Sequence, residues 1–281
     1  MNKSKKLKDF KKLQFSDDFM FGIVMRNEKI CKRILEIILD LKISKITYPE
    51  GQKSIDMTVA AKSIRLDVYV ENAEHTAVYN IEMQTTLNKN LPKRSRYYQG
   101  LIDLNLLEKG NDYKHLKKSF VIFICTSDPF GRDAYVYTFE NRCVQMPDLA
   151  LGDDAVKIFL NAGGFKGKIG QELKGLLEYI NTGIPTDSFT EKLETEVRKI
   201  RKNERWRRDY MTLEMKLNEE REEAYEEGRE EGLAEGLEKG RNILISLVLD
   251  GLLTNEQAAE RAGLSLDEFQ KKKQEYLKRK S

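Results

Sequence analysis

Two short runs of alternating apolar and polar residues, joined by a polar turn, constrain the fold more than any other feature of this sequence. The first run extends from Ser63 to Glu71 and the second from Ala77 to Gln84. Alternation with a period of two is the pattern of a strand whose two faces meet different surroundings. Polar residues 72–75 separate the runs, so the sequence predicts an antiparallel β-hairpin.

The expected register of this hairpin gathers acidic side chains. If Asn72 pairs with Ala77 across the turn, Asp67 falls opposite Glu82. Opposed residues of an antiparallel pair point to the same face and lie about 5 Å apart. Gln84 is two residues further along and shares this face. The sequence therefore places two carboxylates and an amide on one surface of the predicted sheet.

These carboxylates form a candidate metal site. Neighbouring carboxylates raise each other's proton affinity, and a divalent cation relieves their repulsion. Oxygen ligands without histidine or cysteine suit Mg²⁺, with Mn²⁺ as a substitute. Asp67 and Glu82 are the candidate ligands, and the backbone carbonyl of Met83 is a third. The alternative is that both carboxylates lie on the solvated face of a two-sided sheet, and alternation taken alone favours that interpretation.

Further elements are expected on both sides of the hairpin. Residues 17–41 have the apolar spacing of one amphipathic helix, with Ser16 as its N-cap. Pro92 opens a second helix, which ends near Gly110. The continuous apolar run from Phe120 to Cys125 is typical of a buried central strand. The other expected elements are strands around 135–143 and 156–160 and a helix at 170–180.

The chain changes character after Pro185. Residues 190–240 are rich in Glu, Lys and Arg, and glycines recur every four residues from Gly228 to Gly240. Either these glycines let a partner helix approach, or they weaken a solvated helix by about 1 kcal/mol each. Larger apolar side chains keep the spacing of a long helix with a narrow seam. They are Leu193, Val197, Ile200, Trp206, Tyr210, Leu213 and Leu217.

The last segment, 243–278, contains two helical patterns joined at Gly263. It resembles the start of a helix-turn-helix, with Ser265 capping the second helix. The first of these helices carries Glu256 and Glu260, and this acidity disfavours DNA binding. We therefore expect a packing role for this segment.

Composition narrows the class of protein. The chain has 281 residues, 34% of them charged, and a net charge of +3. We expect a cytoplasmic protein with no membrane partner, because no segment has the apolar length of a membrane span and no signal peptide is recognisable. The cysteines, Cys31, Cys125 and Cys143, are expected to be reduced core residues. The only histidines, His75 and His115, exclude a zinc finger and any motif that needs paired histidines beside other ligands.

The N-terminus is basic. Its first dozen residues carry six lysines against one acid, Asp9. Such an arm can bind phosphates by counterion release, or it can be no more than a solubilising terminus.

The hairpin and its surroundings resemble a known family. The resemblance is carried by RLDVYV, YNIEMQ and LPKRSRYYQGLI, with FSDDFMFGIVM upstream, and covers residues 15 to about 185. These segments resemble the PD-(D/E)XK nuclease family transposases, also called the Rpn family of recombination-promoting nucleases. The resemblance implies an α/β fold with a restriction-endonuclease-like αβββαβ core and a mixed central sheet, followed by a helical C-terminal region. It also implies a divalent metal ion and cleavage of double-stranded DNA.

The resemblance also implies roles for the hairpin residues. Asp67 and Glu82 match the metal-binding aspartate and glutamate of the motif. Gln84 stands where most of the superfamily has a lysine, and we interpret it as orienting a water or a phosphate. Asp18 matches an acidic position that adds a metal ligand, with Asp17 as its competitor.

Residues of the helix after the hairpin match a family pattern of arginine and paired tyrosines. Arg96, Tyr98 and Gln99 are expected to contact DNA or support the site, although one of Tyr97 and Tyr98 is expected in the core. Lys93 and Arg94, also on this helix, are expected to form a solvated positive rim that attracts DNA without sequence preference.

The sequence thus predicts a basic arm over 1–14, a nuclease domain over 15–185 and a charged helical region over 186–281. The predicted protein is a Mg²⁺-dependent DNA endonuclease acting in recombination, mobile-element biology or defence. It is expected to form homo-oligomers through the C-terminal helices. The alternative is a catalytically degenerate nuclease fold that acts as a DNA-binding or oligomeric interaction protein, because glutamine replaces the motif lysine.

Overall fold

A computed structural model of the chain describes residues 8–48, 68–87, 89–107 and 112–280. The chain divides into two compact units, Met1–Tyr210 and Met211–Ser281. The division falls inside one helix, α6 (Glu204–Leu249). No helix among the described residues combines the length and the apolar character needed to cross a membrane.

The first unit is built on a six-stranded sheet with the order β1-β2-β3-β4-β6-β5. Strands β3, β4 and β6 run parallel to one another, while β1, β2 and β5 pair antiparallel to their neighbours. The strands are β1 (Ile46–Thr47), β2 (Val68–Asn72), β3 (Ala77–Gln84), β4 (Lys118–Cys125), β5 (Val136–Phe139) and β6 (Ala155–Asn161). Strand β4 is central and buried on both faces, which confirms the prediction made from its continuous apolar run.

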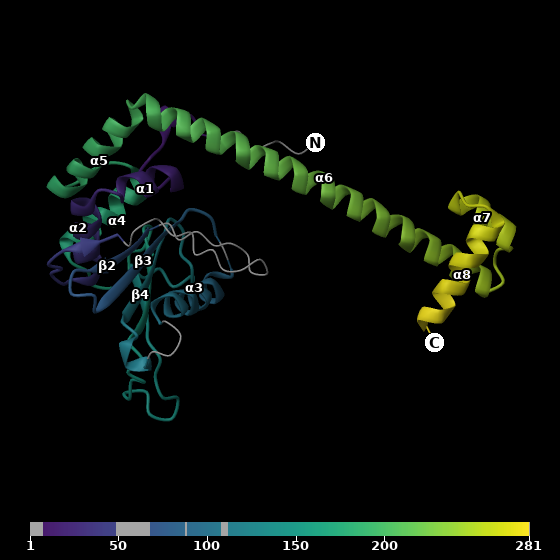
Figure 1. The fold of residues 1–281 in the computed structure, drawn as a ribbon, viewed down its shortest axis with the longest axis horizontal. Coiled ribbons are helices and arrows are strands. Elements are labelled where there is room, and N and C mark those ends of the chain that lie inside the picture. The colour runs from purple at the N-terminus through teal and green to yellow at the C-terminus, as the bar shows by residue number, and fades with distance from the viewer. Residues whose placement is uncertain (1–7, 49–67, 88, 108–111, 281) are drawn as a thin grey trace. The chain divides into compact units, whose positions relative to one another are not determined.

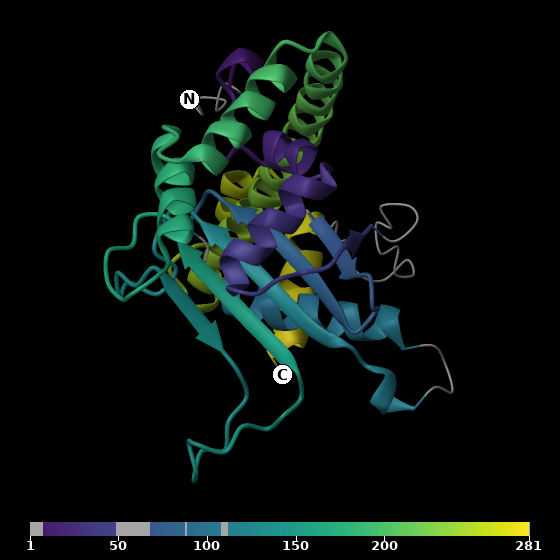
Figure 2. The same ribbon diagram turned by 90° about the vertical axis from the view of Figure 1, so that its left-hand side faces the viewer.

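Helices cover both faces of this sheet (Figures 1 and 2). On one face lie α1 (Asp18–Val24), α2 (Glu28–Leu39) and α4 (Gln171–Thr182), with α5 (Ser188–Arg201) packed beside them. On the other face lies α3 (Leu91–Leu106), whose buried residues pack on β4. The order α2-β1-β2-β3-α3-β4 is the expected αβββαβ core, and the predicted fold class is confirmed.

The helix expected over residues 17–41 is two helices. The chain leaves α1 at Met25 and enters α2 after Asn27, whose side chain accepts hydrogen bonds from the backbone N–H groups of Lys29 and Ile30. Asparagine competes with helical backbone bonds and favours an N-cap, so it starts a new helix. The N-cap of α1 is Asp17 and not Ser16.

The first unit extends past the boundary expected at residue 185. Helix α5 folds back on the sheet domain and buries Leu193, Val197 and Ile200 in the same core as the strands. These residues therefore do not belong to a seam continuous with α6, because Lys202 ends α5 and α6 starts at Glu204. Their apolar spacing reflects burial inside one unit.

The described part of the N-terminal arm also packs on this unit. A short 3₁₀ helix, Phe10–Lys12, buries Phe10 next to Tyr210. The hydroxyl of Tyr210 donates a hydrogen bond to the carbonyl of Lys8, 3.0 Å away. These contacts pack the described part of the arm against the start of α6.

The second unit contains the rest of α6, α7 (Asn255–Ala262) and α8 (Leu266–Lys280). Its small core contains Ile245, Ala258 and Phe269. Gly263 ends α7 in the left-handed conformation that glycine adopts without strain. Ser265 accepts a hydrogen bond from the backbone N–H of Glu268, so the predicted cap of the second helix is confirmed.

Candidate active site

The predicted hairpin is confirmed, including its register. Val68 lies opposite Ile81 and Glu71 opposite Val78, as expected if the turn brings Asn72 to Ala77. Asp67 lies outside the described residues. It directly precedes Val68, whose partner Ile81 directly precedes Glu82.

Glu82 and Gln84 lie near the carboxyl end of β3 and are both buried. Glu82 is 2% exposed and Gln84 is 8% exposed. Both side chains are on the sheet face that α3 covers, so a carboxyl group is held under a helix. A buried carboxylate is unfavourable unless a cation or hydrogen-bond donors compensate it.

Arg94, in the first turn of α3, provides this compensation. Its Nη1 donates to Oε1 of Gln84 at 3.0 Å, and its Nη2 lies 3.4 Å from Oε2 of Glu82. Nη2 also donates to the hydroxyl of Tyr98 at 2.8 Å. The guanidinium carbon lies 5.2 Å from the ring centre of Tyr98 and 5.4 Å from that of Phe123. One arginine thus joins the amide, the carboxylate and an aromatic platform.

This position differs from the solvated rim expected for Lys93 and Arg94. Lys93 is exposed, but Arg94 is turned toward the sheet. Arg94 and Tyr98 are four residues apart and share one helix face, which packs on β3 and β4. Tyr98 is buried and Tyr97 is 43% exposed, so Tyr98 is the core tyrosine of the pair. The four-residue spacing from Arg94 to Tyr98 indicates an inward-facing arginine only once Tyr98, and not Tyr97, is known to be the buried tyrosine.

The amide of Gln84 is fixed in one orientation. Its Nε2 donates to the carbonyl and to Oγ1 of Thr86, at 2.6 and 3.0 Å. Both amide protons are therefore used, and only Oε1 faces Arg94. An oxygen can accept a hydrogen bond from a water but cannot bind the oxygens of a phosphate. In this geometry Gln84 has no amide proton left to donate to a phosphate.

A further acidic side chain comes from α1. It is Asp18, the first residue of that helix, and it is close enough to Arg94 to interact with its charge. Desolvation raises the pKa of Asp18, the charge of Asp17 raises it further, and the nearby charge of Arg94 acts in the opposite direction. Asp17 itself is engaged elsewhere, because it accepts hydrogen bonds from Lys8 Nζ at 2.7 Å and from the backbone N–H of Gln14 at 2.6 Å. Asp18 thus interacts electrostatically with Arg94, whereas Asp17 is held by Lys8 and Gln14.

The backbone around Met83 also supports its candidate role. The carbonyl of Gln84 accepts a hydrogen bond from the backbone N–H of Thr126 at the end of β4. Successive carbonyls of a strand point to opposite sides, so the carbonyl of Met83 points away from β4, toward the β2 side. On that side lies β2, which begins at Val68.

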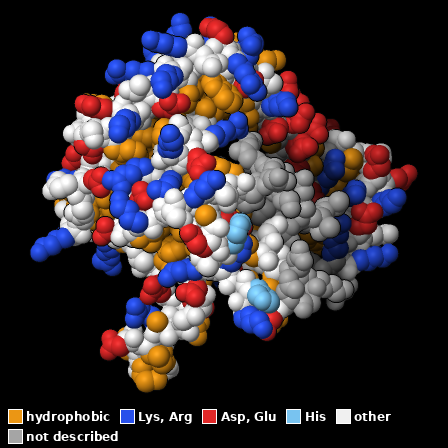
Figure 3. Space-filling model, turned by 60° about the vertical axis from the view of Figure 1, so that its left-hand side comes forward, with side chains coloured by type: hydrophobic (Ala, Val, Ile, Leu, Met, Phe, Trp, Pro, Cys, Tyr) orange, Lys and Arg blue, Asp and Glu red, His pale blue; other side chains and the backbone are white. Residues whose placement is uncertain are grey.

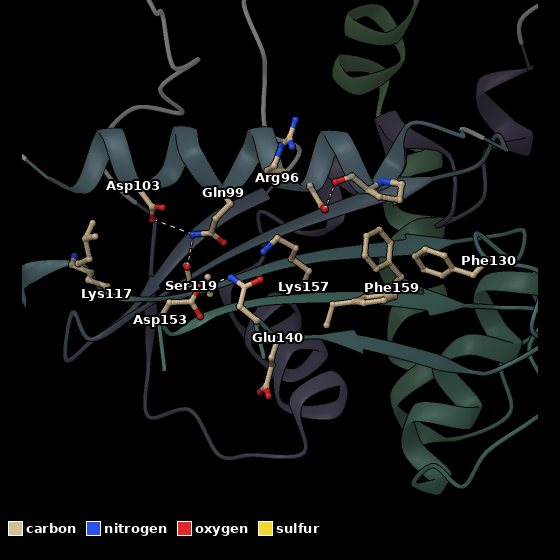
Figure 4. Close-up of a pocket in the computed structure, with 16 residues that line it drawn as sticks. Arg96, Gln99, Asp103, Lys117, Ser119, Phe130, Glu140, Asp153, Lys157 and Phe159 are labelled. Carbon is tan, nitrogen blue, oxygen red and sulfur yellow. Dashed lines mark hydrogen bonds between the residues drawn. The ribbon is translucent and has the colours of Figure 1, made fainter. Parts of the chain in front are cut away.

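Arg96 and Gln99 do not join this group. They line a separate cavity of about 610 Å³ between α3 and strands β4 and β6, and neither Glu82 nor Gln84 is among its lining residues (Figure 4). Gln99 donates to Oγ of Ser119 at 2.6 Å and to Asp103 at 3.1 Å. Its role in the described structure is to hold α3 on the sheet.

The candidate ligand atoms are of the chemical type that a hard divalent cation binds. The candidate ligands, Glu82, Asp18 and the carbonyl of Met83, supply only oxygen atoms. Among the described residues no three histidine, cysteine, aspartate or glutamate side chains are grouped closely enough to hold a metal ion. The three cysteines do not compete as ligands, because Cys31 and Cys125 are buried free thiols and Cys143 lies in the loop between β5 and β6.

On the face drawn in Figure 3, the charged side chains do not mark out a single DNA-binding surface. Figure 3 shows one side of the molecule, on which Lys and Arg side chains are interspersed with Asp and Glu. The site is therefore defined by its buried residues.

Comparison with known proteins finds one family. Residues 14–153 match the family model described as PD-(D/E)XK nuclease family transposase. This match covers the described hairpin, α3, β4 and β5. No curated protein and no solved structure matches the chain.

Proposed function

The chain belongs, through residues 14–153, to the PD-(D/E)XK nuclease family transposases, and we propose on this premise that it is a metal-dependent endonuclease of double-stranded DNA. The observation that carries the proposal is the buried carboxylate of Glu82, which shares the end of β3 with the fixed amide of Gln84. Nuclease chemistry is the activity of this family, and its members generally use divalent metals.

Mg²⁺ is the proposed cofactor, and Mn²⁺ is expected to substitute for it. Glu82 and Asp67 would hold the ion, with the carbonyl of Met83 and Asp18 as further ligands. A bound ion of this kind lowers the pKa of a water and stabilises negative charge on a phosphodiester.

The protein's own residues are assigned the remaining tasks. Gln84 accepts a hydrogen bond from the attacking water through Oε1, the atom that its bonds to Thr86 leave facing the site. Tyr98 supports the site by packing, because its ring is stacked on Phe123 with centroids 6.0 Å apart. Lys93 and Arg96 are exposed cations near the same end of α3 and are proposed to attract the DNA backbone.

Cutting both strands of a duplex would need two sites, and we propose self-association through the C-terminal helices. The support is the exposure of large apolar side chains along α6, with Leu233 at 64% and Leu237 at 50%. Sedimentation of the full chain tests this, and a monomeric mass at micromolar concentration would refute it.

The function itself is tested by incubating purified protein with supercoiled plasmid in Mg²⁺, in Mn²⁺ and in EDTA. Wild type is expected to nick or linearise the plasmid only with metal, and Asp67→Ala and Glu82→Ala are expected to abolish cutting. Glu140→Ala, a change to an exposed carboxylate in the same unit, is the control and should cut normally. If wild type binds DNA in a gel shift but cuts nothing with either metal, the catalytically degenerate DNA-binding protein replaces the endonuclease.

A further inference from the structure

We infer that Arg94 takes over, from helix α3, the positive charge that Gln84 cannot supply from strand β3, and that it does so by binding the phosphate to be cut. The inference rests on the proposed endonuclease function and adds a residue to its site.

The first support is the position of the guanidinium. It lies 3.0 Å from Gln84 and 3.4 Å from Glu82, so it occupies the place where a longer cationic side chain at position 84 would put its charge. The neighbouring cations Lys93 and Arg96 are exposed and have no such contacts among the described residues. Arg94 is therefore the cation of this helix turn that is built into the site.

The second support is that Arg94 is held rigidly while part of it faces solvent. Tyr98 and Phe123 lie against the guanidinium, and Tyr98 also accepts a hydrogen bond from it. The side chain keeps 34% of its surface exposed. A charge fixed in advance costs little reorganisation when a negative group arrives, and this is the main requirement for stabilising a transition state electrostatically.

The third support is the supply of donors. A guanidinium has five N–H groups. The described contacts to Gln84, Glu82 and Tyr98 use three of them, one on Nη1 and two on Nη2. The remaining two, on Nη1 and Nε, lie on different edges of the guanidinium, so each can donate a single hydrogen bond to a phosphate oxygen.

A purely structural role would explain some of the same contacts. In that case Arg94 would only neutralise the buried Glu82 and pack on the rings. The two roles differ in what a lysine at position 84 should do, because such a lysine would restore a charge facing the phosphate without restoring the contacts on Tyr98 and Phe123.

The test compares Arg94→Gln, Arg94→Lys and the double variant Gln84→Lys/Arg94→Gln, with Arg142→Gln, at an exposed arginine after β5, as the matched control. Loss of one preorganised charge is expected to slow metal-dependent plasmid cutting by about 10²–10³-fold in Arg94→Gln. Arg94→Lys should retain part of the activity, and the double variant should cut at least about tenfold faster than Arg94→Gln. Arg142→Gln should cut nearly as fast as wild type. Thermal unfolding followed by circular dichroism verifies that each variant is folded.

A second readout does not depend on cutting. Binding of a short duplex is measured by fluorescence anisotropy in Ca²⁺ over a series of salt concentrations. Removal of one phosphate contact should lower the salt slope by about one unit in Arg94→Gln, and Gln84→Lys should restore it. An unchanged slope in a folded Arg94→Gln protein, or a double variant no better than Arg94→Gln in either assay, would overturn the inference. If wild type cuts no DNA, the endonuclease proposal fails in the plasmid assay, whereas the salt slope still decides whether Arg94 binds phosphate.

Discussion

The hydroxyl of Tyr179 donates a hydrogen bond to Glu194 across 3.0 Å and joins α4 to α5 inside the core of the first unit. Tyr179 is 1% exposed, so this bond lies in the interior. The helix that follows the apparent domain edge at Pro185 is therefore part of the first unit.

The boundary of this unit can be tested by truncation. A chain that ends after Pro185 loses Leu193, Val197 and Ile200 from the core, each of which contributes about 1.5–3 kcal/mol through burial. We expect that chain to aggregate or to lack a cooperative thermal transition. A chain that ends after Tyr210 should unfold cooperatively, as measured by circular dichroism. Equal behaviour of the two truncations would contradict the packing of α5.

A point substitution tests the same packing in the full chain. Leu193→Ala removes a fully buried side chain and should lower the free energy of unfolding by about 2–5 kcal/mol in a urea titration. Leu149→Ala, at an exposed side chain in the loop between β5 and β6, should change it by less than about 0.5 kcal/mol. A comparable loss in both variants would show that the exposed residue has a partner.

Acid stability should depend on Glu36. Burial alone would raise the pKa of Glu36, but hydrogen bonds from Lys32 and from the backbone N–H of Ile43 outweigh burial and hold it below its ordinary value of 4.5. A carboxyl with a lowered folded-state pKa stabilises the protein above its unfolded-state pKa, and this contribution is lost as the pH falls through the folded-state value. The unfolding free energy should therefore decrease below about pH 4.5. Glu36→Gln should flatten this decrease in urea titrations repeated across pH.

Thiol reactivity should single out one cysteine. Burial raises the pKa of Cys31 and of Cys125 to about 12, so neither forms a thiolate near neutral pH. Cys143 is partly exposed. A disulfide reagent at pH 8 should label one equivalent rapidly in the native protein and three after unfolding. Cys143→Ser should abolish the rapid phase, and its persistence would show that a buried thiol is accessible.

The sequence predicted the hairpin register and the central strand correctly because both depend on a short-range period that burial imposes directly. The alternation ending at Gln84 and the apolar run ending at Cys125 could belong to few other structures. The role of α5 could not be predicted in this way, since the spacing of Leu193, Val197 and Ile200 is the same for a coiled-coil seam and for a helix buried in a core.

The candidate site could be predicted only in part, because the motif identifies residues but not the contacts that they make. Glu82 and Gln84 follow from the motif, but the motif does not show that the amide protons of Gln84 are used by Thr86. Arg94 was expected in solvent because charged residues usually lie there. Its inward direction depends on which face of α3 packs on the sheet, a tertiary relationship that local pattern does not fix.

Metal binding tests the central claim most directly, because it does not require knowledge of the preferred DNA sequence. Mn²⁺ is titrated into the wild type, Glu82→Gln, Asp67→Asn and the control Glu140→Gln, and free Mn²⁺ is followed by electron paramagnetic resonance. The account predicts binding by the wild type and the control, with loss of at least about tenfold in affinity, or about 1.4 kcal/mol, in each of the other two. Equal Mn²⁺ affinity in all four proteins would contradict a metal site at the end of β3.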